Sequence, residues 1–236
     1  MQKYIATVIA AGLMLSSGAA LSLSEPNDAF RLERQTAQSD LIFKGTITSI
    51  AYRNSAEGIP HTFVTYRVDD VLKGSYGART LTLRFVGGVE RKGVIVRTLV
   101  ASNAPDFERG QQDVLMMKGN GEVSCPLVQC ALGRYRMEQG RVKTEVGGVI
   151  AKSNDGGAVV LSGGNARIAS GGLAVKLSDG TVATPYSQAE FISLVRSVAS
   201  QQRTSATRAK PIRSMDPSRP FNGTLPNVAA APPQLR

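Results

Sequence analysis

The sequence contains no tryptophan and only one histidine, His61, and these two absences narrow its possible functions. With 6% aromatic residues, the chain lacks the side chains that stack on carbohydrates or line a large ligand pocket. Any Ser-His-Asp or Cys-His triad would have to use His61. The chain contains neither Gly-x-Ser-x-Gly nor Ser-x-x-Lys, so no nucleophile motif accompanies that histidine. The sequence therefore predicts a protein that is not an enzyme and has no catalytic residues.

Metal ligands and cofactor motifs are equally scarce. Only two cysteines accompany His61, too few for a zinc site with four nitrogen or sulfur ligands. Asp69 and Asp70 are neighbours in an expected strand, so their carboxylates point to opposite faces and do not converge. None of the glycine-rich stretches has the spacing of a phosphate-binding loop. We expect no metal and no cofactor, and a calcium site built from scattered oxygen atoms is the remaining alternative.

The two cysteines, Cys125 and Cys130, are separated by four residues that begin with Pro126. Redox chemistry of the thioredoxin type uses Cys-x-x-Cys at a helix N-terminus, which this spacing does not match. In an oxidising compartment, an even and closely spaced pair typically forms a disulfide. We predict a structural disulfide that closes a small loop and holds a local shape.

Charge is almost absent from the first 24 residues, where Lys3 is the only charged side chain. The apolar run Tyr4–Leu15 and the small residues 16–20 follow it, in the order of a secretory signal peptide. A transmembrane helix needs about 20 consecutive apolar residues, and Ser16 interrupts this run earlier. We predict that residues 1–24 are a signal peptide, that the protein is periplasmic or extracellular, and that no membrane span remains after cleavage.

Residues 202–236 differ in composition from the rest of the chain. They hold six of the eleven prolines, and six basic residues against one acidic residue, so half of the net charge of +10 lies there. Few of them are apolar enough to form a core, so we predict a disordered tail. The tail is either a solvated segment without a specific role or an electrostatic tether to an anionic envelope component. The tether residues would be Arg203, Arg208, Lys210, Arg213 and Arg219.

Nucleic acid is not an expected partner. The chain is predicted to be exported, and it carries no helix-turn-helix, zinc-finger or RNA-binding motif. Its net positive charge therefore points to a protein or to an anionic component of the envelope.

Short stretches of β-branched and apolar residues alternate with glycine turns, which is typical of a small barrel or sandwich. The predicted strands are Leu41–Ile50, His61–Leu72, Thr80–Val86, Val94–Val100, Asp113–Lys118, Ala131–Glu138 and Arg141–Val146. We predict a mainly β fold, with an OB-like small β-barrel over residues 25–146 and a short N-terminal helix over residues 26–38. The loops 54–60 and 86–93, of which the second contains Arg91 and Lys92, are the expected binding loops.

Residues 147–201 are richer in glycine than the preceding segment. Glycine-rich segments flank two short apolar runs, Ala158–Leu161 and Leu173–Leu177, so we expect hairpins here. Ser187 and Glu190 form a capping box that opens a helix. One face of that helix would carry Phe191, Leu194, Val195 and Val198. We predict glycine-rich hairpins followed by a C-terminal helix that packs on the barrel.

Three stretches, Ser39–Ile47, Phe63–Gly74 and Phe107–Leu115, share a further pattern. The first begins Ser-Asp-Leu-Ile before a glycine, the second ends Val-Leu-Lys-Gly, and the third places Arg-Gly-Gln before an apolar strand. Together they resemble the opening strands of exported bacterial proteins related to the netrin-module or tissue-inhibitor-of-metalloproteinase-like fold. The resemblance covers roughly residues 39–146. It implies an OB-like five-stranded barrel and a secreted metalloprotease as a partner.

The resemblance does not extend to the inhibitory end of that family. Its metalloproteinase inhibitors chelate the protease zinc through a disulfide-bonded cysteine at the mature N-terminus, whereas this mature chain would begin near residues 21–25 without a cysteine. No inhibitory residue is therefore transferred. We expect an exported, non-catalytic binding module that recognises a protein or envelope partner. The alternatives are a structural envelope protein tethered by its basic tail and a hydrolytic enzyme that uses His61.

Overall fold

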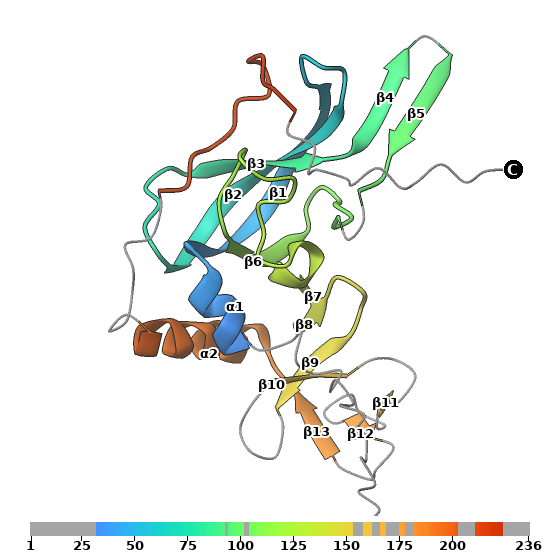
Figure 1. Cartoon of the computed structure of the whole chain (residues 1–236). Coiled ribbons are helices and arrows are strands. Elements are labelled where there is room, and N and C mark those ends of the chain that lie inside the picture. Colours follow the sequence, from blue (N-terminus) through green and yellow to red (C-terminus); the bar gives the residue numbers. More distant parts are fainter. Residues whose placement is uncertain are drawn as a thin grey trace, which may run out of the picture.

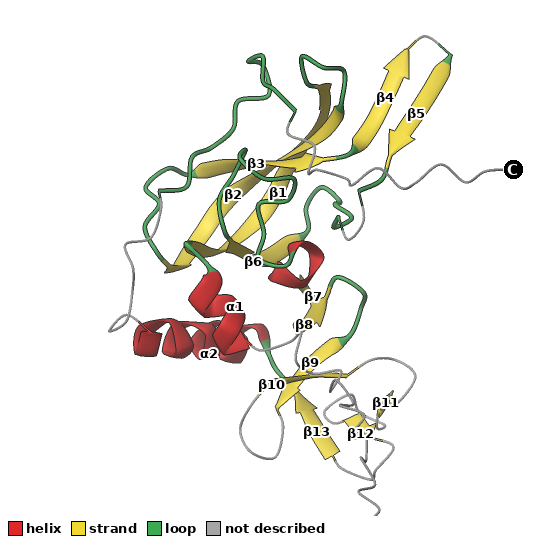
Figure 2. Ribbon diagram, in the orientation of Figure 1, coloured by secondary structure: helices red, strands yellow, loops and turns green. Residues whose placement is uncertain are grey.

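The computed structural model describes residues 32–92, 94–101, 104–152, 158–161, 166–168, 175–177, 182–202 and 211–223. The predicted signal peptide lies outside these ranges. Strands predominate over helices, which confirms the mainly β prediction (Figure 2). No described helix is both long enough and apolar enough to cross a membrane.

The described elements follow one another as a series of strands between two α-helices (Figure 1). In chain order they are α1 (Leu32–Gln38), β1 (Leu41–Asn54), β2 (Pro60–Lys73), β3 (Thr80–Val86), β4 (Gly88–Lys92), β5 (Ile95–Leu99), β6 (Gln112–Met117), the short 3-10 helix η1 (Cys130–Gly133), β7 (Arg134–Glu138), β8 (Arg141–Thr144), β9 (Val149–Lys152), β10 (Ala158–Leu161), β11 (Ala166–Ile168), β12 (Val175–Leu177), β13 (Val182–Pro185) and α2 (Gln188–Gln201).

Most strands belong to one antiparallel sheet with the order β11-β12-β13-β9-β8-β7-β6-β1-β2-β3, and β10 also pairs with β9. The long strands β1 and β2 pair over almost their whole length, with three register shifts. The strands β4 and β5 form a separate two-stranded sheet.

The main sheet is not closed into a barrel, which corrects the prediction of an OB-like small β-barrel within the mainly β fold. Within the described ranges, its end strands β3 and β11 do not pair with each other. The outer edge of β3 is already occupied, because the Thr82 N–H donates to Ser214 Oγ at 2.9 Å and the Thr82 carbonyl accepts from Met215 N at 3.0 Å. Further along, the Val86 N–H donates to the Ser124 carbonyl at 2.8 Å. These bonds satisfy the groups that barrel closure would have used.

Two apolar cores lie on the two faces of the sheet. Side chains alternate between the faces of a strand, and β1 and β6 supply residues to both cores. Ile42 and Met116 join the first core, whereas Phe43 and Leu115 join the second. The first core also receives Phe191 and its neighbours from α2, and the second is completed by Ile212 from the C-terminal region.

The helix α2 begins as the sequence predicts. Ser187 Oγ accepts from the Glu190 N–H at 3.3 Å, and Glu190 Oε2 accepts from the Ser187 N–H at 3.0 Å, which completes the capping box. Phe191, Val195 and Val198 are buried and Leu194 packs against them. The helix therefore docks on the sheet through the predicted apolar face.

Two sequence predictions of local structure are wrong. The expected loop 86–93 contains the strand β4, which pairs with β5. The expected strand Ala131–Glu138 begins only at Arg134, because Gln129 and Cys130 have φ angles of 53° and the chain continues as the 3-10 helix η1. The glycine-rich segments 153–157, 162–165, 169–174 and 178–181 lie outside the described residues.

Residues 211–223, which we call the docked segment, are part of the tail predicted to be disordered. They pack instead along β3 and the β1–β2 turn (red in Figure 1). Ile212 is buried in the second core, and the Phe221 ring contacts the His61 and Phe63 rings. These apolar side chains supply contacts that the proline-rich composition obscures, so the prediction of disorder is wrong here. Residues 203–210 and 224–236 lie outside the described ranges.

Candidate binding site

The β4–β5 hairpin projects away from the main sheet (Figure 1). Two glycines fasten its base. Gly87 has a φ angle of 101° and donates to the Pro60 carbonyl at 2.9 Å, while its own carbonyl accepts from Thr62 Oγ1 at 2.8 Å. A Cβ on Gly88 would lie 2.8 Å from that same Thr62 oxygen. The connection between the hairpin and the sheet is therefore held by hydrogen bonds and close packing, and is not a flexible linker.

The hairpin exposes apolar side chains. Val94 is 99% exposed and Val100 is 81% exposed, and Val96 and Leu99 are also open to solvent. Tyr52 on the neighbouring strand β1 is exposed as well. Arg91, Lys92 and Arg97 oppose only Glu90 in the hairpin sequence, so its charge is positive. Exposed apolar side chains on a segment with a net basic sequence are typical of a protein-binding surface.

Beside the hairpin, the structure contains an apolar groove made of two adjoining hollows of about 260 Å³ and 360 Å³. Both hollows are lined by Phe85, Val86, Ala101 and Ala104. The first extends to the hairpin through Val89, Thr98 and Leu99. The second extends to the cysteine loop through Ser124 and Leu127. The groove thus runs from the base of the hairpin to the disulfide.

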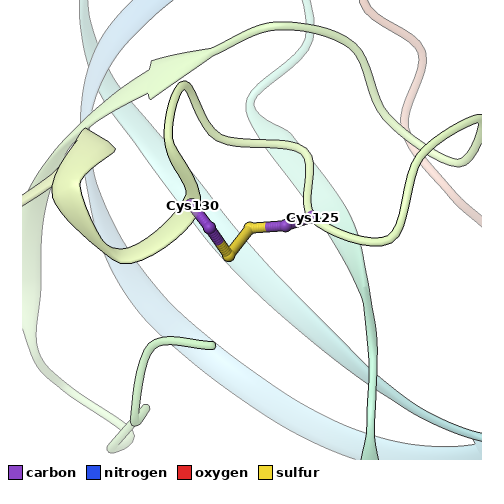
Figure 3. The surroundings of a disulfide bond; sticks show 2 residues. All are labelled: Cys125 and Cys130. Atoms are coloured by element: carbon purple, nitrogen blue, oxygen red, sulfur yellow. A yellow bond between two sulfur atoms is a disulfide. The ribbon is translucent and has the colours of Figure 1, made fainter. Parts of the chain in front are cut away.

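The disulfide between Cys125 and Cys130 is confirmed, with the two Cα atoms 5.5 Å apart (Figure 3). Both cysteines line the second hollow of the groove. Immediately beside the loop, the Val128 N–H donates to the Met116 carbonyl and the Lys118 N–H donates to the Pro126 carbonyl, each at 2.8 Å. The bridge closes the loop that forms one wall of the groove, and these hydrogen bonds hold that loop against β6.

A buried charged network contacts another part of the groove lining. Arg134 and Asp113 are both fully buried, and Arg134 Nε donates to Asp113 Oδ2 at 3.0 Å. Tyr66 donates its hydroxyl to the same oxygen at 2.8 Å. The Arg134 guanidinium lies 4.7 Å from the centre of the Phe107 ring and also donates to the Asp106 carbonyl. Both Asp106 and Phe107 line the groove, so this network fixes their position.

The pKa shifts of the network residues are consistent with a structural role for the network. Burial raises the pKa of Asp113, and the adjacent Arg134 charge opposes the rise. Burial also raises the pKa of Tyr66 well above its usual range, and the Asp113 charge adds to the shift, so Tyr66 remains a hydrogen-bond donor. Glu145 Oε2 accepts from Arg134 at 2.9 Å and supplies further negative charge to the guanidinium.

No sequence motif indicated either the groove or the network. One sequence pattern, however, did point to the network. Asp113 lies two and four positions before Leu115 and Met117, so its side chain is on the same face of the strand as these two residues of the second core. A carboxylate at an inward position needs a partner. Nothing in the sequence identified Arg134 as that partner, because the two residues lie on adjacent strands and meet only after pairing.

Among the described residues, His61 bonds to no serine, cysteine or carboxylate side chain of the kind that a catalytic triad requires. Its side chain is fully buried, Nδ1 lies 2.8 Å from the Ile59 carbonyl, and Nε2 has no hydrogen-bond partner in the described part of the chain. Burial lowers the pKa of the imidazole, and the Arg84 charge lowers it further. Asp69 bonds to Arg67 and Thr46 while Asp70 pairs with Arg196, so the two carboxylates have separate partners. The described residues contain no group of three or more His, Cys, Asp or Glu placed to hold a metal ion.

Two of the predicted tether residues lie in the docked segment. Arg213 accepts a hydrogen bond from Asn120 Nδ2 at its carbonyl oxygen, at 2.7 Å, and Arg219 pairs with Asp216 on the surface. Arg203, Arg208 and Lys210 lie outside the described residues, so the envelope tether stays a prediction. Comparison of the chain with protein-family models, curated proteins and solved structures found no match.

Proposed function

We propose that the protein is an exported, non-catalytic binding module that holds a partner protein between the β4–β5 hairpin and the adjoining groove. The observation that carries this proposal is the exposure of Val94 and Val96 on the hairpin, and of Val100 directly after it, beside an apolar groove. Export is supported by the composition of residues 1–24 and by a disulfide, which persists in oxidising compartments.

The chemistry of the surface indicates the kind of partner. The exposed valines would be covered by apolar side chains, and the basic residues of the hairpin favour acidic residues around them. The partner surface is therefore apolar at its centre and acidic at its rim. A secreted metalloprotease is one partner to test, because of the resemblance of residues 39–146 to the netrin-module and tissue-inhibitor-of-metalloproteinase-like fold. The inhibitory N-terminal cysteine of that fold has no counterpart here.

Hairpin substitutions test the proposal. The mature chain, residues 25–236, is immobilised as the wild type and as Val96→Asp, and both are exposed to the exported fraction of the protein's own cells. The matched control is Val146→Asp, because Val146 is 85% exposed in the turn after β8 and does not line the groove. We expect Val96→Asp to weaken retention of the captured protein at least about ten-fold, as loss of an interface hot spot does. Val146→Asp should retain it like the wild type.

The wild-type complex should also weaken as salt is raised, because salt screens the contribution of the basic residues. Two results would overturn the proposal. One is that the wild type captures no protein from the exported fraction. The other is that the wild type, Val96→Asp and Val146→Asp all retain the same protein equally well.

A further inference from the structure

The docked segment, residues 211–223, contacts the sheet in the manner of a bound peptide. Ser214 Oγ accepts the Thr82 N–H and the Met215 N–H donates to the Thr82 carbonyl, so the segment bonds to both outward main-chain groups of one β3 residue. Asn120 joins the two, because its Nδ2 donates to the carbonyls of Thr82 and Arg213 at 2.8 Å and 2.7 Å. Main-chain bonding to a free strand edge is a general mode of peptide recognition.

Two apolar anchors fix the ends of this contact. Ile212 is buried in the second core. Nine residues later, the Phe221 ring lies 4.9 Å from the His61 ring and 5.2 Å from the Phe63 ring, both nearly edge-on. The Arg84 guanidinium lies over the Phe221 ring at 4.8 Å, which adds a cation–π contact. Phe221 therefore fills a site formed by aromatic rings and a cation.

The last residues of the docked segment bond to the β1–β2 turn. The Ala56 N–H donates to the Phe221 carbonyl at 3.0 Å, and the Gly223 N–H donates to Glu57 Oε2 at 2.7 Å. This second bond lowers the pKa of Glu57. The segment thus makes separate contacts with β3, with the aromatic site and with the turn, and none of its residues lines the groove beside the hairpin.

We infer that the β3 edge is a second binding surface, for an extended peptide of a partner protein, and that the docked segment occupies it as an intramolecular ligand. The resident contacts define the peptide: an aliphatic residue, a hydroxyl residue two positions later and an aromatic residue nine positions after the first. A covalently attached segment competes at an effective concentration of about millimolar. A partner peptide therefore binds only when it displaces the segment, which makes the segment autoinhibitory. This surface is independent of the hairpin proposed above.

Binding of a labelled peptide to the full mature chain tests this inference. The probe is a fluorescent peptide of residues 211–223, and the readout is fluorescence anisotropy. The chain variant Phe221→Ala weakens the resident segment without changing the surface beneath it, and Met215→Pro does so by removing the N–H that bonds to Thr82. The control variant is Arg219→Ala, because Arg219 is exposed and pairs only with Asp216 among the described residues.

We expect the wild-type peptide to bind the Phe221→Ala and Met215→Pro chains at least about ten-fold more tightly than the wild-type and Arg219→Ala chains. A peptide that itself carries Phe221→Ala should bind all of them weakly. Equal binding of the wild-type peptide to every chain, or binding to none, would overturn the inference. Light scattering identifies the occupant. If the wild-type chain forms a dimer by exchanging this segment, the occupant is a second copy of the chain and the assignment to a partner peptide is wrong.

Discussion

The edge of β3 and the β4–β5 hairpin are adjacent in sequence, but another segment of the chain covers the β3 edge while the hairpin exposes apolar side chains. At β3, the docked segment and Asn120 bond to the outward main-chain groups of Thr82, and Ile212 adds an apolar cover. At the hairpin, Val94 and Val96 remain exposed. Proteins usually cover or charge such edges, because bare ones associate with other chains. The docked segment must leave before another chain can pair with β3, whereas the exposed valines of the hairpin need no such displacement to contact a partner.

The largest expected effect lies in the buried network, on which the groove depends. Arg134→Ala leaves the buried Asp113 carboxylate without its cation, and the loss of one partner of a buried pair costs about 3–5 kcal/mol of the free energy of unfolding. Denaturant unfolding of the full mature chain measures this change. Arg67→Ala removes another Arg–Asp pair, but Arg67 is exposed, so its cost should stay below about 1 kcal/mol. Similar losses for the two variants would contradict a structural role for the network.

The disulfide comes next. Replacing both Cys125 and Cys130 with serine removes a bridge with a sequence separation of five, for which the loop-closure relation gives about 2 kcal/mol. Because the bridge holds a wall of the groove, partner retention should fall together with stability, whereas the resident Phe221 contacts at the β3 edge should be unchanged. Thermal unfolding with and without reductant measures the loss of stability. The immobilised-chain assay measures the loss of partner retention. Unchanged retention by a folded double variant would separate the disulfide from the groove.

The third prediction concerns pH at the covered edge. The pKa of His61 is lowered in the folded protein, whereas in the unfolded chain it is about 6.5. As pH falls below about 6.5, the unfolded chain binds the proton more readily, so stability declines until pH has passed below the folded pKa. The charged groups that face His61 are Arg84 and Glu57. Because a hydrogen bond from Gly223 lowers the pKa of Glu57 from its ordinary value, Glu57 does not account for a loss of stability between pH 7 and 5.

The measurement is the free energy of unfolding at pH 7 and pH 5 for the wild type and for His61→Gln. Glutamine does not titrate and keeps an amide donor for the Ile59 carbonyl. The wild type should lose more stability than the variant between the two pH values. If the loss is the same in both, His61 is not the group responsible.

The sequence was most informative where local rules decide structure. Thr80–Val86 alternates clearly and is β3 with those same bounds, and the capping box at Ser187 opens α2. The cysteine spacing predicted the disulfide. In each case, the decisive residues lie within a few positions of one another, so propensity and spacing are sufficient.

The sequence was least informative where residues far apart in the chain meet. The outer edge of β3 bonds to Ser214 and Met215, more than 100 residues downstream, and no local sequence pattern indicates that contact. The docked segment was predicted to be disordered because its average composition is rich in proline and charge. Such an average does not reveal that two apolar residues, Ile212 and Phe221, can anchor it. For the candidate site, the sequence predicted a binding loop at residues 86–93 from Arg91 and Lys92. It did not predict the strand pairing there, the exposed valines or the groove.

The smallest expected effect on stability is also the one that tests the comparison of the two edges most directly. Val96→Ser on the exposed hairpin should change the free energy of unfolding by no more than about 0.5 kcal/mol, because the side chain already contacts water. Val64→Ala on β2 removes methyl groups from the second core and should cost about 2 kcal/mol. Chemical denaturation of both variants gives this contrast. If Val96→Ser destabilises the protein as much as Val64→Ala, the hairpin valines serve the fold, and their exposure no longer argues for a partner.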